Sequence, residues 1–130
     1  MVSWEDCNLN RPVPAIIFHG TADPIVPFEG GTSESFDVPF PNITEWVQYM
    51  AEKHGCERIP KTIPTKGEVY GNHFTDCVRN ADVDYYIIDG GGHSWPGGNP
   101  LSKWIDRHTN DDINATQTMW KFFIAHPKKD

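Results

Sequence analysis

Three segments of the chain have the hydrophobic pattern of β-strands. Residues 13–18 form a short continuous apolar run, which is typical of a strand covered on both faces, as in a parallel sheet. Residues 83–88 are a second apolar strand, and residues 68–77 form a weaker one. The four residues 79–82 fit a hairpin turn between the last two strands.

Two other segments have helical periodicity. Asn42 begins the first helix, Glu45 follows three residues later as in a capping box, and Gly55 supplies the stop after residue 54. Its apolar and ring-bearing positions follow helical spacing: Ile43, Trp46, Val47, Met50 and His54. The second helix, residues 111–126, is capped by Asn110 or Asp111. Its predicted apolar stripe consists of Ile113, Trp120, Phe123 and Ile124.

The remaining segments are predicted to be irregular. Residues 29–41 form a loop, residues 58–65 form a connector with two prolines, and residues 90–107 form a loop rich in glycine and proline. No internal repeat and no second domain is found, so residues 1–130 are expected to form one α/β domain. We predict a small, mainly parallel sheet, extended by one antiparallel hairpin strand and covered by helices 42–54 and 111–126.

Length and charge narrow the classes of partner. A chain of 130 residues can form one modest core, and its net charge of −7 argues against nucleic acid and anionic membrane surfaces as partners. No apolar run is long enough to cross a bilayer, and the first residues lack the pattern of a signal peptide. We therefore expect no nucleic-acid partner and no membrane partner.

The three cysteines, Cys7, Cys56 and Cys77, cannot all pair within one chain. The predicted helix ends at Cys56 and a predicted strand ends at Cys77. Their spacing leaves open a disulfide between these two or three reduced thiols. No C-x-x-C motif occurs and the histidines lack metal-ligand spacing, so we predict neither a metal nor a cofactor.

Two motifs carry candidate chemistry. Residues 19–27 read His-Gly-Thr-Ala-Asp-Pro-Ile-Val-Pro after the first strand, and residues 90–98 read Gly-Gly-Gly-His-Ser-Trp-Pro-Gly-Gly after the last. They place Asp23 and His93 just beyond strand ends, where parallel strands bring loops to one edge of the sheet. An Asp followed by a His is the acid and base of a Ser-His-Asp hydrolase, in the chain order of α/β-hydrolases.

Each residue also has a purely structural explanation. Asp23 alone would be a turn or cap residue, and His93 alone would be a loop histidine bound to a backbone carbonyl; together, the two contexts favour a catalytic ancestry. The chain contains no G-x-S-x-G, so no serine lies on a nucleophile elbow. Ser94 adjoins His93, but neighbouring residues in a loop usually point apart.

Several motifs together resemble one family of hydrolases. They are Arg11–Pro14, His19–Pro27, His54–Cys56, Asn80–Val83, Gly90–Gly98, Trp120–Phe123 and His126–Pro127. Over nearly its whole length the chain resembles the carboxy-terminal part of the polyhydroxybutyrate depolymerase and feruloyl-esterase-like group of α/β-hydrolases. The fold that this implies is a partial α/β-hydrolase fold, without the half that bears the nucleophile and the oxyanion-hole loop.

The resemblance also implies roles for individual residues. Asp23 matches the triad acid and His93 the triad base, while Trp95 falls where the family lines its substrate cleft. Packing against the sheet edge is the alternative role for Trp95. The resemblance implies a disulfide between Cys56 and Cys77, leaves Cys7 unpaired, and suggests an extracellular, secreted protein.

Two functions follow from different classes. The chain is either the portion of a serine esterase that supplies Asp and His for hydrolysis of polyester or feruloyl-type esters, or a non-catalytic remnant that binds a partner or an aromatic ligand beside Trp95. Without a neighbouring strand, residues 13–18 would leave a bare apolar sheet edge, so we expect self-association there.

Overall fold

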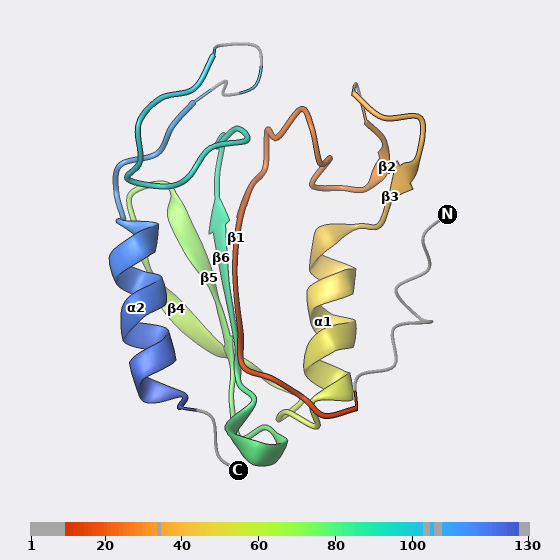
Figure 1. Cartoon of the computed structure of the whole chain (residues 1–130), viewed down its shortest axis with the longest axis vertical. Coiled ribbons are helices and arrows are strands. Elements are labelled where there is room, and N and C mark those ends of the chain that lie inside the picture. Colours follow the sequence, from red (N-terminus) through yellow and green to blue (C-terminus); the bar gives the residue numbers. More distant parts are fainter. Residues whose placement is uncertain (1–9, 34, 103–104, 106–107, 128–130) are drawn as a thin grey trace.

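The structure is a computed structural model that describes residues 10–33, 35–102, 105 and 108–127. A four-stranded sheet lies between two helices, α1 (Ile43–Lys53) on one face and α2 (Ala115–Ala125) on the other (Figure 1). The strands of this sheet are β1 (Ala15–Gly20), β4 (Lys61–Lys66), β5 (Val69–Phe74) and β6 (Val83–Ile88). The α/β class predicted from the sequence is therefore confirmed.

The sheet is mixed, in the order β1-β6-β5-β4. Only β1 and β6 pair in parallel, from Ala15 opposite Val83 to Gly20 opposite Ile88, whereas β5–β6 and β4–β5 are antiparallel. The expectation of a mainly parallel sheet does not hold, because one of the three pairings is parallel. The parallel pair nevertheless lies where it matters for the candidate chemistry, at the two strands that precede Asp23 and His93.

Antiparallel pairings outnumber the parallel one because of β4, a strand that the sequence pattern did not predict. Residues 58–65 were expected to form a connector because they hold two prolines, yet Lys61–Lys66 is a strand. Pro64 is tolerated there because β4 lies at the sheet edge, and the pairing with β5 shifts register between Ile63 and Lys66. Of the six residues of β4 only Ile63 is buried, so the strand has almost no apolar signal.

Two further expectations are corrected in part. Residues 29–41, expected to be loop, contain the two-residue strands β2 (Gly31–Thr32) and β3 (Pro39–Phe40), which pair with each other. The predicted hairpin turn between β5 and β6 includes a 3-10 turn, η2 (Val78–Asn80). The apolar run predicted over 13–18 forms its strand two residues later, whereas the strand over 83–88 has the predicted bounds.

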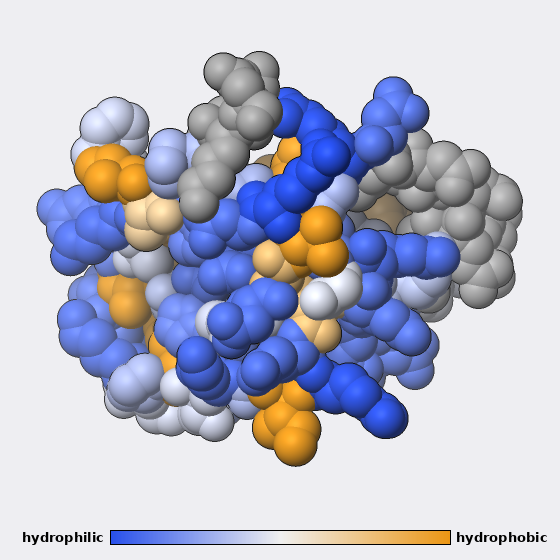
Figure 2. All heavy atoms as spheres, turned by 90° about the horizontal axis from the view of Figure 1, so that it is seen from below, coloured by the Kyte–Doolittle hydropathy of each residue, from blue (hydrophilic) through white to orange (hydrophobic). Residues whose placement is uncertain are grey.

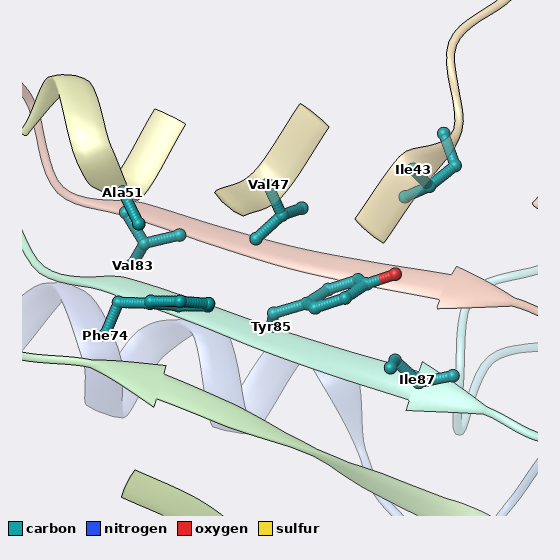
Figure 3. Packing of buried hydrophobic residues seen from close by; sticks show 7 residues of the cluster. All are labelled: Ile43, Val47, Ala51, Phe74, Val83, Tyr85 and Ile87. Atoms are coloured by element: carbon teal, nitrogen blue, oxygen red, sulfur yellow. The ribbon is translucent and has the colours of Figure 1, made fainter. Parts of the chain in front are cut away.

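Helix α1 begins as predicted. Asn42 is its N-cap, and the Asn42 side chain accepts a hydrogen bond from the Glu45 backbone N–H at 3.1 Å. The buried face of α1 packs on the β6 side chains that point to that face of the sheet, and Phe74 of β5 completes the cluster (Figure 3). This core cluster consists of Ile43, Val47, Ala51, Phe74, Val83, Tyr85 and Ile87.

Helix α2 departs from the prediction at both its start and its buried face. Its N-cap is Asn114, so the helix begins later than residue 111. Ala115 and Phe122 are its buried residues, and the predicted stripe largely faces outward, with Trp120 67% and Ile124 63% exposed. The stripe was wrong because the buried positions are Ala115 and Phe122, and a small residue such as Ala115 adds little to a pattern based on large apolar side chains.

Cys56 and Cys77 form a disulfide, which joins the end of α1 to the segment after β5. This is the pairing that the family resemblance implied. Cys7, expected to be unpaired, lies outside the described residues. In the described part of the chain no helix has the length and apolar character required to span a membrane.

The end of the molecule where η2 lies is seen in Figure 2, which views the structure of Figure 1 from below. This face is mostly hydrophilic, with small separate apolar groups. The loops that follow β1 and β6 lie at the opposite end (Figure 1), where the candidate chemistry is found.

Candidate active site

The two motif loops leave the sheet side by side. Gly20, the last residue of β1, pairs with Ile88, the last residue of β6, and the Thr21 N–H donates to the Ile88 carbonyl at 2.9 Å. The Ala22 N–H then donates to the Gly91 carbonyl at 3.0 Å, which joins the loops beyond the strands. A Cβ on Gly20 would meet the Gly91 oxygen at 2.1 Å, so only glycine permits this approach.

The carboxylate of Asp23 is buried and fixed from one side. Its Oδ1 accepts hydrogen bonds from the backbone N–H groups of Ile25 at 2.8 Å and Val26 at 2.9 Å. Its side chain is 6% exposed. These bonds occupy Oδ1 and leave Oδ2 available to other groups. The turn that was the purely structural explanation of Asp23 therefore also orients its carboxylate.

His93 meets that free oxygen. Its Nδ1 lies 2.8 Å from Asp23 Oδ2, although the two residues are 70 positions apart in the chain. An ionised carboxylate only accepts hydrogen bonds, so Nδ1 donates and Nε2 is the basic nitrogen of the neutral ring. The His93 side chain is 44% exposed, which leaves the ring accessible to a reacting group.

The loop of His93 is held by a polar cluster that sequence reasoning missed. The Gly92 N–H donates to the His108 carbonyl at 3.0 Å, and the Gly97 N–H donates to the Asn110 carbonyl at 2.8 Å. The buried side-chain amide of Asn110 donates to Glu68 at 3.1 Å and to Asp112 at 2.8 Å. No motif marks these residues, because they come together only when the β4–β5 turn meets the loop after β6.

A cavity of about 570 Å³ opens beside the pair, a volume in the range of small-molecule sites. Its lining is largely apolar and includes both Asp23 and His93. Other residues of the lining are Phe18, His19, Val26, Phe40, Trp46, Ile88, Trp95 and Leu101. The cavity therefore combines a proton-accepting nitrogen with a hydrophobic wall.

Trp95 lies in this wall and is anchored on two sides. Its indole N–H donates to the Thr116 hydroxyl at 2.9 Å, and its ring packs edge-on against Phe18 with centroids 5.5 Å apart. Its 46% exposure leaves part of the ring open to the cavity. Packing and cavity lining, the two roles considered for Trp95, therefore coexist.

His19, which precedes Asp23 by four residues, was not singled out from the sequence. Its Nε2 lies 4.0 Å from Asp23 Oδ2 and its side chain is 11% exposed. Burial is the main cause that lowers the pKa of His19 below 6.5; the hydrogen bond with the Gly20 carbonyl and the Asp23 charge act in the opposite direction. The i, i+4 spacing of His and Asp across the strand end is the signal that could have found it.

A second His–Asp pair lies elsewhere on the sheet. His73 Nδ1 is 2.7 Å from Asp84 Oδ1, and neither residue is among those that line the cavity of His93. Burial raises the pKa of Asp84 above 3.8 although the hydrogen bond from His73 lowers it. His54, which follows the helical spacing of the first predicted helix, is 1% exposed and bonds the Ala81 carbonyl through Nδ1.

The nearest serine in the chain does not engage the pair. Ser94 lines the cavity, but no hydrogen bond joins its hydroxyl to His93 in the described part of the structure. The same described residues contain no group of three or more His, Cys, Asp or Glu side chains arranged to hold a metal ion.

Comparison with known proteins finds similarity to esterases. No family model matches the chain. The chain is 33% identical over 103 residues to "Feruloyl esterase B" of Piromyces equi. The aligned region covers 72% of this chain and 18% of that protein. It is 25% identical over 130 residues to "Putative esterase NocK" of Nocardia uniformis subsp. tsuyamanensis. Here the aligned region covers 88% of this chain and 38% of that protein.

The chain thus spans well under half the length of both curated relatives. The similarity indicates an esterase-type hydrolase ancestry for this chain and no narrower family.

Proposed function

We propose that this chain supplies the acid and the base of a serine esterase, with Asp23 as the acid and His93 as the base. The observation that carries the proposal is the 2.8 Å contact between His93 Nδ1 and Asp23 Oδ2, two residues that line an apolar cavity. The similarity to two esterases supports the same chemistry.

In this proposal His93 Nε2 takes the proton of a serine hydroxyl as the hydroxyl oxygen attacks the ester carbonyl. His93 then returns the proton to the departing alkoxide, and repeats both steps with water to release the acid. Asp23 keeps the Nδ1–H tautomer in place and stabilises the imidazolium that forms. Its two backbone hydrogen bonds keep the carboxylate from turning away during these steps.

The serine and the oxyanion donors would come from a separate segment, because this chain has no G-x-S-x-G. In this proposal the chain has a partial α/β-hydrolase fold, which corresponds to the C-terminal part of an α/β-hydrolase. Strand β1 supports it, because among the described strands β1 is paired only with β6 and its other edge is open to a further strand.

The substrate class we propose is a carboxylic ester with an apolar or aromatic group, of the polyester or feruloyl type. Phe18, Trp46 and Trp95 line the cavity and give it an aromatic lining suited to such a group. The Cys56–Cys77 disulfide is compatible with an oxidising, extracellular location for the assembled enzyme.

A chimera tests this proposal. The chain would replace the matching segment of the Nocardia esterase, and hydrolysis of a short p-nitrophenyl ester would be measured. We expect hydrolysis that falls at least about 100-fold in His93→Gln and Asp23→Asn, as for loss of a catalytic base or its partner. His73→Gln is the matched control, since it removes the other His–Asp pair, and should leave the rate unchanged.

A folded chimera without esterase activity would contradict the proposal and favour the second candidate, a non-catalytic domain that binds a partner or an aromatic ligand beside Trp95. That candidate is favoured by the absence of a nucleophile motif together with an intact apolar cavity. It predicts that His93→Ala has no effect on ligand binding, which isothermal titration with ferulic acid would measure.

The chain alone is expected to hydrolyse p-nitrophenyl acetate no faster than its His93→Ala variant. If the isolated chain is active and both His93→Ala and Asp23→Ala abolish the activity, a nucleophile lies within this chain or its assembly. The proposal of a separate nucleophile segment would then be wrong.

A further inference from the structure

The carboxylate of Asp23 faces two imidazole rings. His93 Nδ1 lies 2.8 Å from Oδ2, and His19 Nε2 lies 4.0 Å from the same oxygen. Oδ1 is occupied by the backbone N–H groups of Ile25 and Val26. Oδ2 is thus the oxygen for which the two rings could compete.

The neutral form of His19 does not compete for this oxygen. His19 Nδ1 lies 3.0 Å from the Gly20 carbonyl oxygen, which can only accept, so Nδ1 carries the proton. Nε2 is then unprotonated and has no hydrogen to donate to Asp23. Burial lowers the pKa of His19 and thereby favours this neutral form.

The ring of His19 and the carboxylate of Asp23 are both largely buried and lie close together. The His19 side chain is 11% exposed and that of Asp23 is 6% exposed. Phe28 packs against His19 with ring centroids 5.9 Å apart, which adds an apolar neighbour to this ring. The titratable groups that act on His19 are Asp23, from the loop after β1, and His93, from the loop after β6.

We propose that His19 is a positioning residue that acts on His93 through Asp23. As a neutral ring it shields Asp23 from water and leaves Oδ2 to His93. When it gains a proton on Nε2, it becomes a second donor for Oδ2 and competes with His93 for that oxygen. The inference rests on the proposed roles of Asp23 and His93, and its test requires no turnover.

The shielding role is tested by the ¹⁵N chemical shifts of the His93 ring nitrogens in the labelled chain at pH 8, which report whether Nδ1 carries the proton. His19→Phe keeps an apolar ring and should retain the Nδ1–H tautomer. His19→Ala opens the carboxylate to water and should reduce the population of that tautomer. An unchanged tautomer in a folded His19→Ala chain would overturn this role.

Competition for Oδ2 is tested by titrating the His19 ring in the intact chain by NMR. Asp23→Asn should lower the pKa of His19 further, because it removes a neighbouring negative charge, and His93→Gln should raise it, because it removes a competing imidazole. Asp84→Asn is the matched control, because it alters the carboxylate of the other His–Asp pair and should not move this titration.

A pKa of His19 that is unchanged in both Asp23→Asn and His93→Gln would overturn the proposed competition. The two proposals fail in different ways. If His93 in the unaltered chain carries no proton on Nδ1, the proposed catalytic pair fails. If that proton is present but the population of this tautomer does not change in the His19 variants, only the present inference fails.

Discussion

Gly20 and Gly91 are in such close contact that a side chain on Gly20 has no space: a Cβ there would meet the Gly91 carbonyl oxygen at 2.1 Å and the Gly92 oxygen at 2.8 Å. The absence of a side chain at Gly20 therefore permits the close approach of the loop of Asp23 to the loop of His93, which the hydrogen bond from Ala22 to Gly91 joins.

Gly20→Ala should therefore disrupt the pair as well as destabilise the fold. We expect a loss of about 1–3 kcal/mol in the free energy of unfolding, as for overpacking against backbone, and loss of the His93 Nδ1–H tautomer in ¹⁵N spectra. Gly90→Ala is the control, because no atom lies within 4 Å of the added Cβ. It should cost about 1–2 kcal/mol for its positive φ but keep the tautomer, and equal tautomer loss in both variants would contradict the argument.

Asn42→Ala should destabilise the chain by about 1 kcal/mol, because it removes the side-chain cap of α1. Urea unfolding followed by circular dichroism measures the change. Asn42→Asp retains an accepting oxygen for the Glu45 N–H and should recover most of the loss. A loss of the same size in both variants would show that the hydrogen bond from Asn42 to Glu29 matters more than the cap.

Asp84 should make stability depend on pH. Its pKa in the folded chain is raised above 3.8 by burial, so ionisation favours the unfolded chain. Its contribution to stability is fully present below pH 3.8 and is lost as the pH rises through the folded-state pKa. The melting temperature of Asp84→Asn relative to the unaltered chain should therefore be higher at pH 7 than at pH 3.5.

The same comparison for Asp37→Asn, at an exposed position, should show no such dependence. A melting-temperature difference for Asp84→Asn that is equal at both pH values would mean that His73 compensates fully for the burial of the carboxylate.

The open edge of β1 should cause self-association of the isolated chain at high concentration. The Ala15 N–H donates to Asp82 beside β6, so by alternation along a strand the Ile16 N–H points to the open edge. Ile16→Pro removes that donor and should shift the sedimentation profile towards monomer, whereas Ile16→Val keeps it and should not. A chain that stays monomeric at high concentration without any substitution would contradict this prediction.

The elements predicted correctly are those whose signal is local. The apolar run of β6 and the cap at Asn42 depend on residues adjacent in the sequence, and both appear as predicted. Strand β4 was missed because its partner β5 and its edge position, which tolerate Pro64, are properties of the sheet. The face of α2 was mispredicted because the small residue Ala115 is buried whereas the large apolar side chain of Trp120 is exposed.

The candidate site divides in the same way. Asp23 and His93 could be proposed from the sequence because each stands in a motif just after a strand, and the structure brings them to 2.8 Å. The polar cluster around Asn110 could not be proposed from the sequence, since Glu68 and Asp112 belong to segments that meet only in the folded chain. Their roles depend on three-dimensional proximity for which no local pattern exists.

The parallel pairing of β1 with β6 has a consequence for the order of assembly. Strands β4, β5 and β6 follow one another as antiparallel neighbours and can form from local contacts, whereas β1 must wait for a partner that lies more than 60 residues later. Asp23 leaves the ribosome long before His93 does. We therefore expect the acid and the base to meet only when β1 pairs with β6, so that their hydrogen bond would report the closure of this pairing.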